Sequence, residues 1–215
     1  MQVANIITLA EFFIKKHLSG DFSDGHDFAH TMRVVRHSLK LCDKLPEADR
    51  NIVHLAAILH DVARPEESAS KGQVDHAQIG ADIAGEFLLQ HNHPADKTAR
   101  IVQCIREHRF RSGLRPSSLE AQILFDADKL DSLGAIGIAR AFFFAAQNGA
   151  AVHNSREEAL AAEPYSSGDT AFREFLVKLS GLPDAMLTRP GKDEALRLKS
   201  FMQSFFDQLN QEFFS

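Results

Sequence analysis

The stretch Leu55-Ala56-Ala57-Ile58-Leu59-His60-Asp61 decides the fold, because five apolar residues run directly into an imidazole and a carboxylate. The apolar run predicts a helix in the protein interior, for which Pro46 suits the first position and Arg64-Pro65 the end. Burying an ionised carboxylate at the end of such a helix is costly unless it is paired or bound to a metal. A helix end at which Asp61 meets solvent or Arg64 is the commoner explanation of an isolated His-Asp pair, so the pair alone identifies no site.

Helical periodicity continues on both sides of this stretch. Apolar residues at three-and-four spacing predict further helices over about 3–18, 26–45, 76–90, 94–107, 118–147, 170–182 and 192–213. The polar stretch 66–75 predicts a loop, and 148–169 is expected to be partly irregular. Gly134 and Gly137 predict a bend or a close crossing within the longest helix. No strand-like alternation, internal repeat or low-complexity tract stands out, so we expect an all-α, single-domain helical bundle over residues 1–215.

The composition is typical of a cytoplasmic globular protein. The 215 residues are 44% hydrophobic and 25% charged, and the formal net charge is −5. No run of five basic residues occurs, so we expect no nucleic-acid duplex or membrane as a partner. Cys42 and Cys104 lie outside any C-x-x-C, which indicates neither a disulfide framework nor a thiolate zinc site. The amino terminus lacks the pattern of a signal peptide, and no apolar block approaches the roughly 20 residues of a membrane helix.

A second group of polar residues lies in Gly25-His26-Asp27-Phe28-Ala29-His30-Thr31-Met32-Arg33-Val34. His26 and His30 are four residues apart, so on a helix they project from one face within about 6 Å of each other. Arg33 joins that face. Two imidazoles and a guanidinium would repel one another if all were charged, which favours a neutral histidine ligand and an anionic substrate. A polar helix start with surface histidines fits the same residues equally well.

The third group is Asp126-Ala127-Asp128-Lys129-Leu130-Asp131, inside an otherwise apolar helix. Three carboxylates this close together need cations, and a metal is the commonest solution when they point inward. The apolar stripe of this helix places Asp131 most directly toward the core, with Asp126 and Asp128 on its flanks. Spacing alone therefore does not select Asp128.

Together these segments resemble the HD-domain superfamily, named for its H...HD...D pattern of metal ligands. Small bacterial HD phosphohydrolases carry an S/A-H-D-x-x-H-x-x-R-V opening and a D-A-D-[KR]-L-[DE]-x-L-G-A-I-G-[IL]-A-R segment. Residues 25–34 and 126–140 nearly complete both patterns. The resemblance implies a single helical bundle of the HD-domain type, with a catalytic core at about 22–140 and carboxy-terminal helices at about 170–213.

The resemblance also implies which residues bind metal. The four ligands it implies are His30, His60, Asp61 and Asp128. It therefore overrides the preference of the periodicity for Asp131. His76 and His108 occupy places where two-metal HD proteins have extra ligands, so they are second-metal or phosphate contacts unless they are solvated helix ends. Imidazoles and carboxylates together suit Mn²⁺, Fe²⁺, Co²⁺, Ni²⁺ or Zn²⁺, and Mg²⁺ is also compatible.

The resemblance also implies a general acid, and the chemistry of a metal site suggests the other catalytic roles. His26 matches the histidine that helical cyclic-nucleotide phosphodiesterases with this ligand pattern use as general acid. Asp61 is expected to accept the proton of the attacking water, although Asp128 fits that role too, and Arg33 and Lys129 would hold phosphate oxygens. Some HD enzymes carry a glutamate three residues after the aspartate. Arg64 stands there in this chain, so a carboxylate base at that position is not supported.

The expected activity is that of a metal-dependent phosphohydrolase acting on a small phosphorylated substrate, for which similar proteins suggest a nucleotide. One alternative is a di-iron oxygenase of the HD type, which His76 and His108 keep open. Another is a non-catalytic nucleotide-binding regulatory module, although the complete ligand set argues against it. The number of metals and the oligomeric state are not specified by the sequence.

Overall fold

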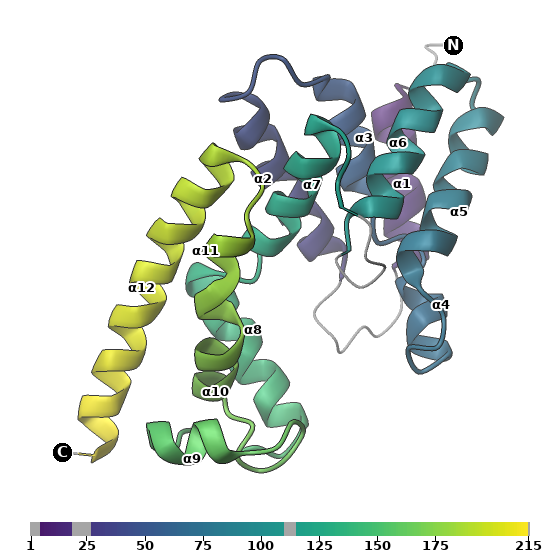
Figure 1. Cartoon of the computed structure of the whole chain (residues 1–215). Helices are drawn as coiled ribbons and strands as arrows, with labels where there is room; N and C mark the ends of the chain where they lie inside the picture. The colour runs from purple at the N-terminus through teal and green to yellow at the C-terminus, as the bar shows by residue number, and fades with distance from the viewer. Residues whose placement is uncertain (1–4, 19–26, 110–114, 215) are drawn as a thin grey trace. The chain divides into compact units, whose positions relative to one another are not determined.

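The computed structural model describes residues 5–18, 27–109 and 115–214, and all regular structure in these ranges is helical (Figure 1). The all-α prediction is therefore confirmed. The chain divides into two compact units, Met1–Asp128 and Lys129–Ser215. The first unit ends before the predicted limit of the catalytic core at about 140, and a single domain over the whole chain stays a prediction. Within the described ranges, no helix is both long and apolar enough to cross a membrane.

The first unit is built around one buried helix. Its helices are α1 (Ile6–His17), α2 (Phe28–Cys42), α3 (Arg50–Leu59), α4 (Arg64–Ala69), α5 (His76–Gln90), α6 (Ala95–Glu107) and most of α7 (Leu119–Leu130). α3 packs against α1, α2 and α6, while α5 runs beside α6 (Figure 1). Seven of the ten residues of α3 are buried, so this helix has almost no solvent face. The residues that follow its carboxyl end, His60 and Asp61, therefore lie in the interior.

Two boundaries in the first unit differ from the prediction. α3 begins at Arg50, not Pro46, because the Asp49 side chain accepts hydrogen bonds from the backbone N–H groups of Asn51 and Ile52. The predicted loop over 66–75 is also partly wrong, since α4 covers its first residues. Pro65 lies in the first turn of α4, where its missing N–H has no partner to lose. This proline therefore begins a helix instead of ending the preceding one.

The second unit contains α8 (Gly134–Gln147), α9 (Arg156–Ala161), α10 (Ala171–Val177), the 3₁₀ helix η2 (Leu179–Gly181), α11 (Leu182–Ala185) and α12 (Arg189–Phe214). α8 packs against α10 and α12, and α12 also packs against α11. Phenylalanine rings fill the contact between α10 and α12, where the Phe175 and Phe206 centroids are 4.9 Å apart. This unit thus has an apolar core of its own.

The predicted single helix over 118–147 is wrong, because the chain turns between α7 and α8. Gly134 adopts a φ of +68°, and a Cβ there would lie 2.8 Å from Leu198. At Gly137 a Cβ would lie 2.2 Å from the backbone oxygen of Ser132. The two glycines thus permit a left-handed turn and a close backbone contact.

One further prediction for the second unit is confirmed and one needs correction. The stretch 148–169 is partly irregular, as predicted, and includes α9, which is fixed by a capping box between Ser155 and Glu158. The predicted helix over 170–182 is divided into α10, η2 and the start of α11.

Candidate metal centre

Six side chains of the first unit converge in its interior, and we call them the interior cluster. They are His30 of α2, His60 and Asp61 after α3, His76 of α5, His108 after α6, and Asp128 of α7. The four histidines and Asp61 are at most 1% exposed, whereas the Asp128 side chain is 20% exposed. All six residues predicted as metal ligands or additional metal contacts are therefore brought together.

Helix capping fixes two of these histidines. The Asp27 side chain accepts a hydrogen bond of 2.7 Å from the backbone N–H of His30, in the first turn of α2. Asp75 caps α5 in the same way by accepting from Ala77, one residue after His76. A capping side chain holds the first helical turn in place. The backbone positions of His30 and His76 are therefore fixed.

Backbone carbonyls set the tautomers of two other histidines. Nδ1 of His60 lies 2.8 Å from the carbonyl oxygen of Ala57, and Nδ1 of His108 lies 2.6 Å from that of Ile105. Because a carbonyl only accepts hydrogen bonds, Nδ1 carries the proton in each ring. Both Nε2 atoms therefore present lone pairs, as metal-binding histidines do.

The first group of donor atoms comes from His30, His60 and Asp128, and one oxygen of Asp61 joins it. Nε2 of His30 lies 3.4 Å from Asp61 Oδ2 and 3.6 Å from Asp128 Oδ1. Nε2 of His60 lies 3.5 Å and 4.0 Å from the same two oxygens. Two atoms that bind one ion at about 2.1 Å are about 3.0 to 4.2 Å apart, so these separations fit a shared divalent ion.

The second group comprises Asp61, His76 and His108. Asp61 Oδ1 lies 3.1 Å from His76 Nε2 and 3.8 Å from His108 Nε2, and the two Nε2 atoms are 3.2 Å apart. The two oxygens of Asp61 thus face different groups, Oδ2 the first and Oδ1 the second. A carboxylate placed in this way is suited to bridge two cations.

The electrostatics of the interior cluster also fit bound metal. Burial lowers the pKa of His60, although the nearby carboxylates of Asp61 and Asp128 oppose the shift. Burial lowers the pKa of His108 further, well below its usual range, and the neighbouring imidazoles add to the effect. Both rings are therefore neutral, which is the protonation state that a metal requires. His60 Nε2 is buried and makes no hydrogen bond within the described ranges, and a buried polar atom of this kind is costly unless something binds it.

Of the other predicted catalytic residues, one lies outside the described residues and two are located by the helices that carry them. His26, the expected general acid, lies outside the described residues. Arg33 is on α2, three residues after His30, and is partly exposed. Lys129 is in the last turn of α7, is partly exposed, and begins the second unit. Their roles stay predictions.

The structure distinguishes Asp128 from Asp131, which residue spacing alone could not do. Asp128 lies beside His30 and His60, as the resemblance implied. Asp131, which the periodicity favoured, is indeed buried, but its Oδ2 accepts a bond of 2.7 Å from Arg140 in the second unit. α7 ends at Leu130, so helical periodicity no longer determines where Asp131 points.

Glu67 is a residue of the centre that sequence reasoning missed. Its carboxylate lies 2.7 Å from Nδ1 of His76 and accepts hydrogen bonds from Arg64 and Arg109. Arg64 also donates from Nε to Asp61 Oδ1 at 3.0 Å. The available signal was Arg64 itself, which stands where some HD enzymes carry a glutamate, since a cation there needs a carboxylate nearby. The prediction of a loop over 66–75, part of which is α4, concealed Glu67.

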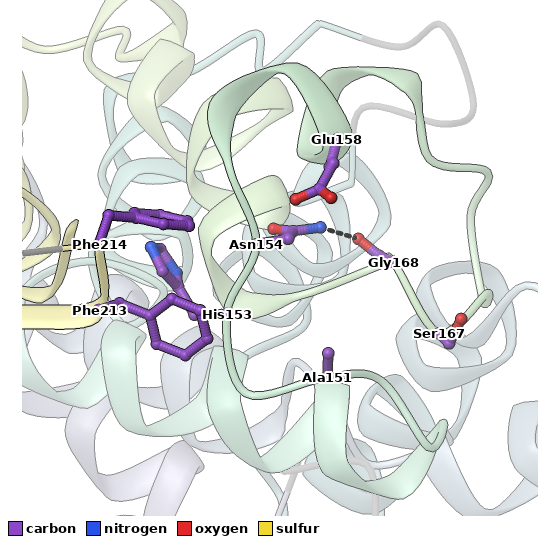
Figure 2. A pocket seen from close by; sticks show the side chains of 8 residues that line it. All are labelled: Ala151, His153, Asn154, Glu158, Ser167, Gly168, Phe213 and Phe214. Atoms are coloured by element: carbon purple, nitrogen blue, oxygen red, sulfur yellow. Dashed lines mark hydrogen bonds between the residues drawn. The ribbon is translucent and has the colours of Figure 1, made fainter.

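The second unit carries a surface hollow of about 480 Å³ (Figure 2). The rings of Phe213 and Phe214 lie close to His153 on one side of it, at centroid distances of 5.2 and 5.7 Å. Asn154 donates from its amide to the backbone oxygen of Gly168. In the described part of the second unit, no three His, Cys, Asp or Glu ligand atoms are close enough to share an ion. The hollow is therefore not a second candidate metal centre.

Comparison with known proteins identifies a protein family that matches most of the first unit of the chain. Residues 27–133 match the HD domain. The uncharacterized protein YpgQ of Bacillus subtilis is 29% identical over 196 residues, which cover 89% of this chain and 86% of YpgQ. The matched HD domain contains all six residues of the interior cluster.

Solved structures extend the similarity over nearly the whole chain. The crystal structure of Bacillus subtilis YpgQ in complex with ADP has a TM-score of 0.74 at 25% identity and covers 99% of this chain and 97% of that one. A HD-superfamily hydrolase from Bacillus thuringiensis has a TM-score of 0.75 at 28% identity, with coverage of 97% and 96%. The similarity therefore includes the helices of both units.

Proposed function

This chain belongs to the HD-domain superfamily and is a metal-dependent phosphohydrolase, and from that premise we propose that it hydrolyses a phosphate ester or anhydride of a nucleotide. The single observation that carries the proposal is the convergence of imidazole lone pairs and carboxylate oxygens in the interior cluster. Neutral histidines and carboxylates in one buried site are the ligands of divalent first-row metals.

A nucleotide is the substrate class that the similarity favours. YpgQ, which matches both in sequence and in fold, has been crystallised with ADP. The net charge of −5 does not oppose an anionic substrate, because a divalent metal and a few cations neutralise phosphate locally. Arg33 and Lys129 are the cations that we propose for this task.

We assign separate tasks to the protein residues. His30, His60, Asp61 and Asp128 would hold the metal, which when bound supplies Lewis acidity and lowers the pKa of a coordinated water. His26, when protonated, would donate to the leaving oxygen.

Either aspartate of the ligand set could accept the proton of the attacking water, and the structure favours a different task for each. The sequence left both Asp61 and Asp128 open as the acceptor, but Asp61 is fully buried and its Oδ1 accepts a hydrogen bond from Arg64. Asp128, with its partly exposed side chain, is therefore the better acceptor, while Asp61 serves as ligand.

We further propose that the centre holds two metals. The second would be bound by His76 and His108, with Asp61 bridging to the first. The opposed Nε2 atoms of His76 and His108, 3.2 Å apart, support this assignment over two solvated helix ends, since both rings are buried. Phosphate contacts alone are less suitable for these rings, because a neutral His108 presents a lone pair and not a donor.

The hydrolase relatives do not favour the di-iron oxygenase, although a two-metal centre is common to both activities. A non-catalytic regulatory module is opposed by the complete ligand set. A cytoplasmic location and the absence of duplex or membrane partners stay predictions of the sequence.

The test is a turnover screen. Purified protein is freed of metal, resupplied under anaerobic conditions with each of Mn²⁺, Fe²⁺, Co²⁺, Ni²⁺, Zn²⁺ and Mg²⁺, and offered nucleotides and simple phosphate esters. We expect phosphate or pyrophosphate release from nucleotides with at least one redox-inert ion. Nucleotide binding without turnover under every ion would favour the regulatory module instead, and turnover only with iron and oxygen would favour the oxygenase.

A further inference from the structure

Glu67 occupies an unusual position, because one carboxylate contacts an imidazole of the interior cluster and two guanidinium groups. Oε2 lies 2.7 Å from His76 Nδ1 and 2.9 Å from Arg64 Nη1, while Oε1 lies 2.6 Å from Arg109 Nη1. The Glu67 side chain is 12% exposed. These contacts join α4, the start of α5 and the segment after α6 at the site.

The contact with His76 decides which nitrogen of that ring faces the metal. A carboxylate only accepts hydrogen bonds, so Nδ1 carries a proton and donates it to Glu67. Arg109 Nη1 lies 3.0 Å from the same Nδ1, but the two hydrogens on this nitrogen have carboxylate acceptors in Glu67 Oε1 and Asp75 Oδ1. With Nδ1 committed to Glu67, Nε2 of His76 is directed toward Asp61 and His108.

The charges around Glu67 reinforce this arrangement. Guanidinium groups donate to both of its oxygens, Arg64 to Oε2 and Arg109 to Oε1, and these charge-assisted hydrogen bonds favour the ionised carboxylate. An ionised acceptor makes the His76 ring more basic at Nε2, as carboxylate partners of metal-binding histidines do. Arg64 connects the same carboxylate to Asp61, so two members of the second group depend on it.

We infer that Glu67 is a positioning residue for the second metal, acting through the hydrogen bond to His76 and, by way of Arg64, on Asp61. The inference rests on the proposed two-metal centre. Arg64 stands where some HD enzymes carry a glutamate, and Glu67 is the carboxylate that balances its charge. The inference gives this carboxylate a role at the site. Glu67 itself neither binds the metal nor contacts the substrate.

The test measures binding of Mn²⁺ to metal-free protein by equilibrium dialysis, in E67A, E67Q and the matched control E66Q. We expect two equivalents in wild type and a loss of about 10- to 100-fold in affinity for one of them in E67A. E67Q keeps an acceptor for His76 but loses the charge, so it should lie between E67A and wild type. E66Q changes an exposed neighbour and should match wild type.

A double-mutant cycle separates positioning from general support of the fold. If Glu67 acts mainly through His76, E67Q should weaken Mn²⁺ binding far less in an H76A background than in wild type. Equal losses in both backgrounds, or an E67A protein that binds both equivalents as tightly as E66Q, would overturn the inference. A wild type that binds a single equivalent unaffected by E67A would overturn it as well. Absence of hydrolysis with these binding results intact would count against the proposed function and not against Glu67.

Discussion

Both units bury ionisable side chains, but they compensate them differently. In the second unit the buried carboxylates meet cations: Asp131 pairs with Arg140 at 2.7 Å, and Asp169 pairs with Arg173 at 2.9 Å. In the first unit, Asp61 accepts from Arg64 at one oxygen, but Asp61 and Asp128 also face histidines that are neutral or present lone pairs. Burial of charge is thus common to the two units, while convergence of electron-pair donors is confined to the interior cluster among the described residues.

This difference teaches how a metal centre is distinguished from a structural ion pair. An ion pair combines a donor with an acceptor and is complete in itself. In the interior cluster, the carbonyls of Ala57 and Ile105 take the Nδ1 protons of His60 and His108, so acceptor atoms are left facing acceptor atoms. Such an arrangement gains stability when a cation is supplied from outside the chain.

The largest expected effect comes from removing a donor of the interior cluster. H60A or D61A should reduce kcat/KM by about 10³-fold or more, because several kcal/mol of metal-dependent stabilisation are lost. Metal content by mass spectrometry should fall in parallel. H91A, which changes an exposed histidine at the end of α5, serves as the control and should retain both metal and activity.

A smaller effect is expected at the predicted proton donor. H26A should slow turnover by about 10²- to 10⁴-fold, the usual contribution of a general acid, while the metal content stays at the wild-type level. Parallel loss of metal would show instead that His26 is a ligand. A substrate with a good leaving group should be affected least, since it needs little protonation.

The comparison predicts the opposite pattern for the second unit. D131N should lower the free energy of unfolding by about 1 to 3 kcal/mol, because Arg140 loses its charged partner. Metal uptake per folded molecule should not change. Denaturant titration and metal analysis of the same sample measure both quantities, and reduced uptake by folded D131N would remove the distinction between the two units.

The smallest expected effect is a change in the free energy of unfolding with pH. Between their lowered folded pKa values and the ordinary value of 6.5, His60 and His108 bind more protons when unfolded. The free energy of unfolding of metal-free protein should therefore fall as pH drops below about 6.5, by at most about 1.4 kcal/mol per pH unit for each group. Glu67, with its pKa below the ordinary 4.5, should add a further loss at lower pH. E67Q should remove that last part of the curve.

Local sequence signals predicted most of the helices, and they failed where tertiary contacts decide. α5 has the predicted bounds, because its apolar pattern and following turn agree. The break before Gly134 was predicted only as a bend or close crossing within one helix, since an apolar sequence on both sides continues the helical period. Pro65 was assigned to a helix end, although proline is equally suited to a first turn, and only the capping and packing of the surrounding chain distinguish the two.

The site was predictable to a different extent from each kind of signal. Periodicity identified a buried carboxylate at Asp131 but could not tell an ion pair from a ligand, because the Arg140 partner comes from another helix. The family resemblance named the six residues that the fold brings together. Neither signal indicated Glu67, which contacts Arg64 at i,i+3 spacing within α4 but meets His76 only through the packing of α4 beside α5.

The most direct test is a crystal structure of the protein grown with Mn²⁺, with anomalous scattering used to locate the ion. We predict a peak coordinated by His30, His60, Asp61 and Asp128, and a second peak beside His76 and His108. Two anomalous peaks would also fix the bridging role of Asp61. A map without a peak at these residues, at a manganese concentration that supports turnover, would contradict the account.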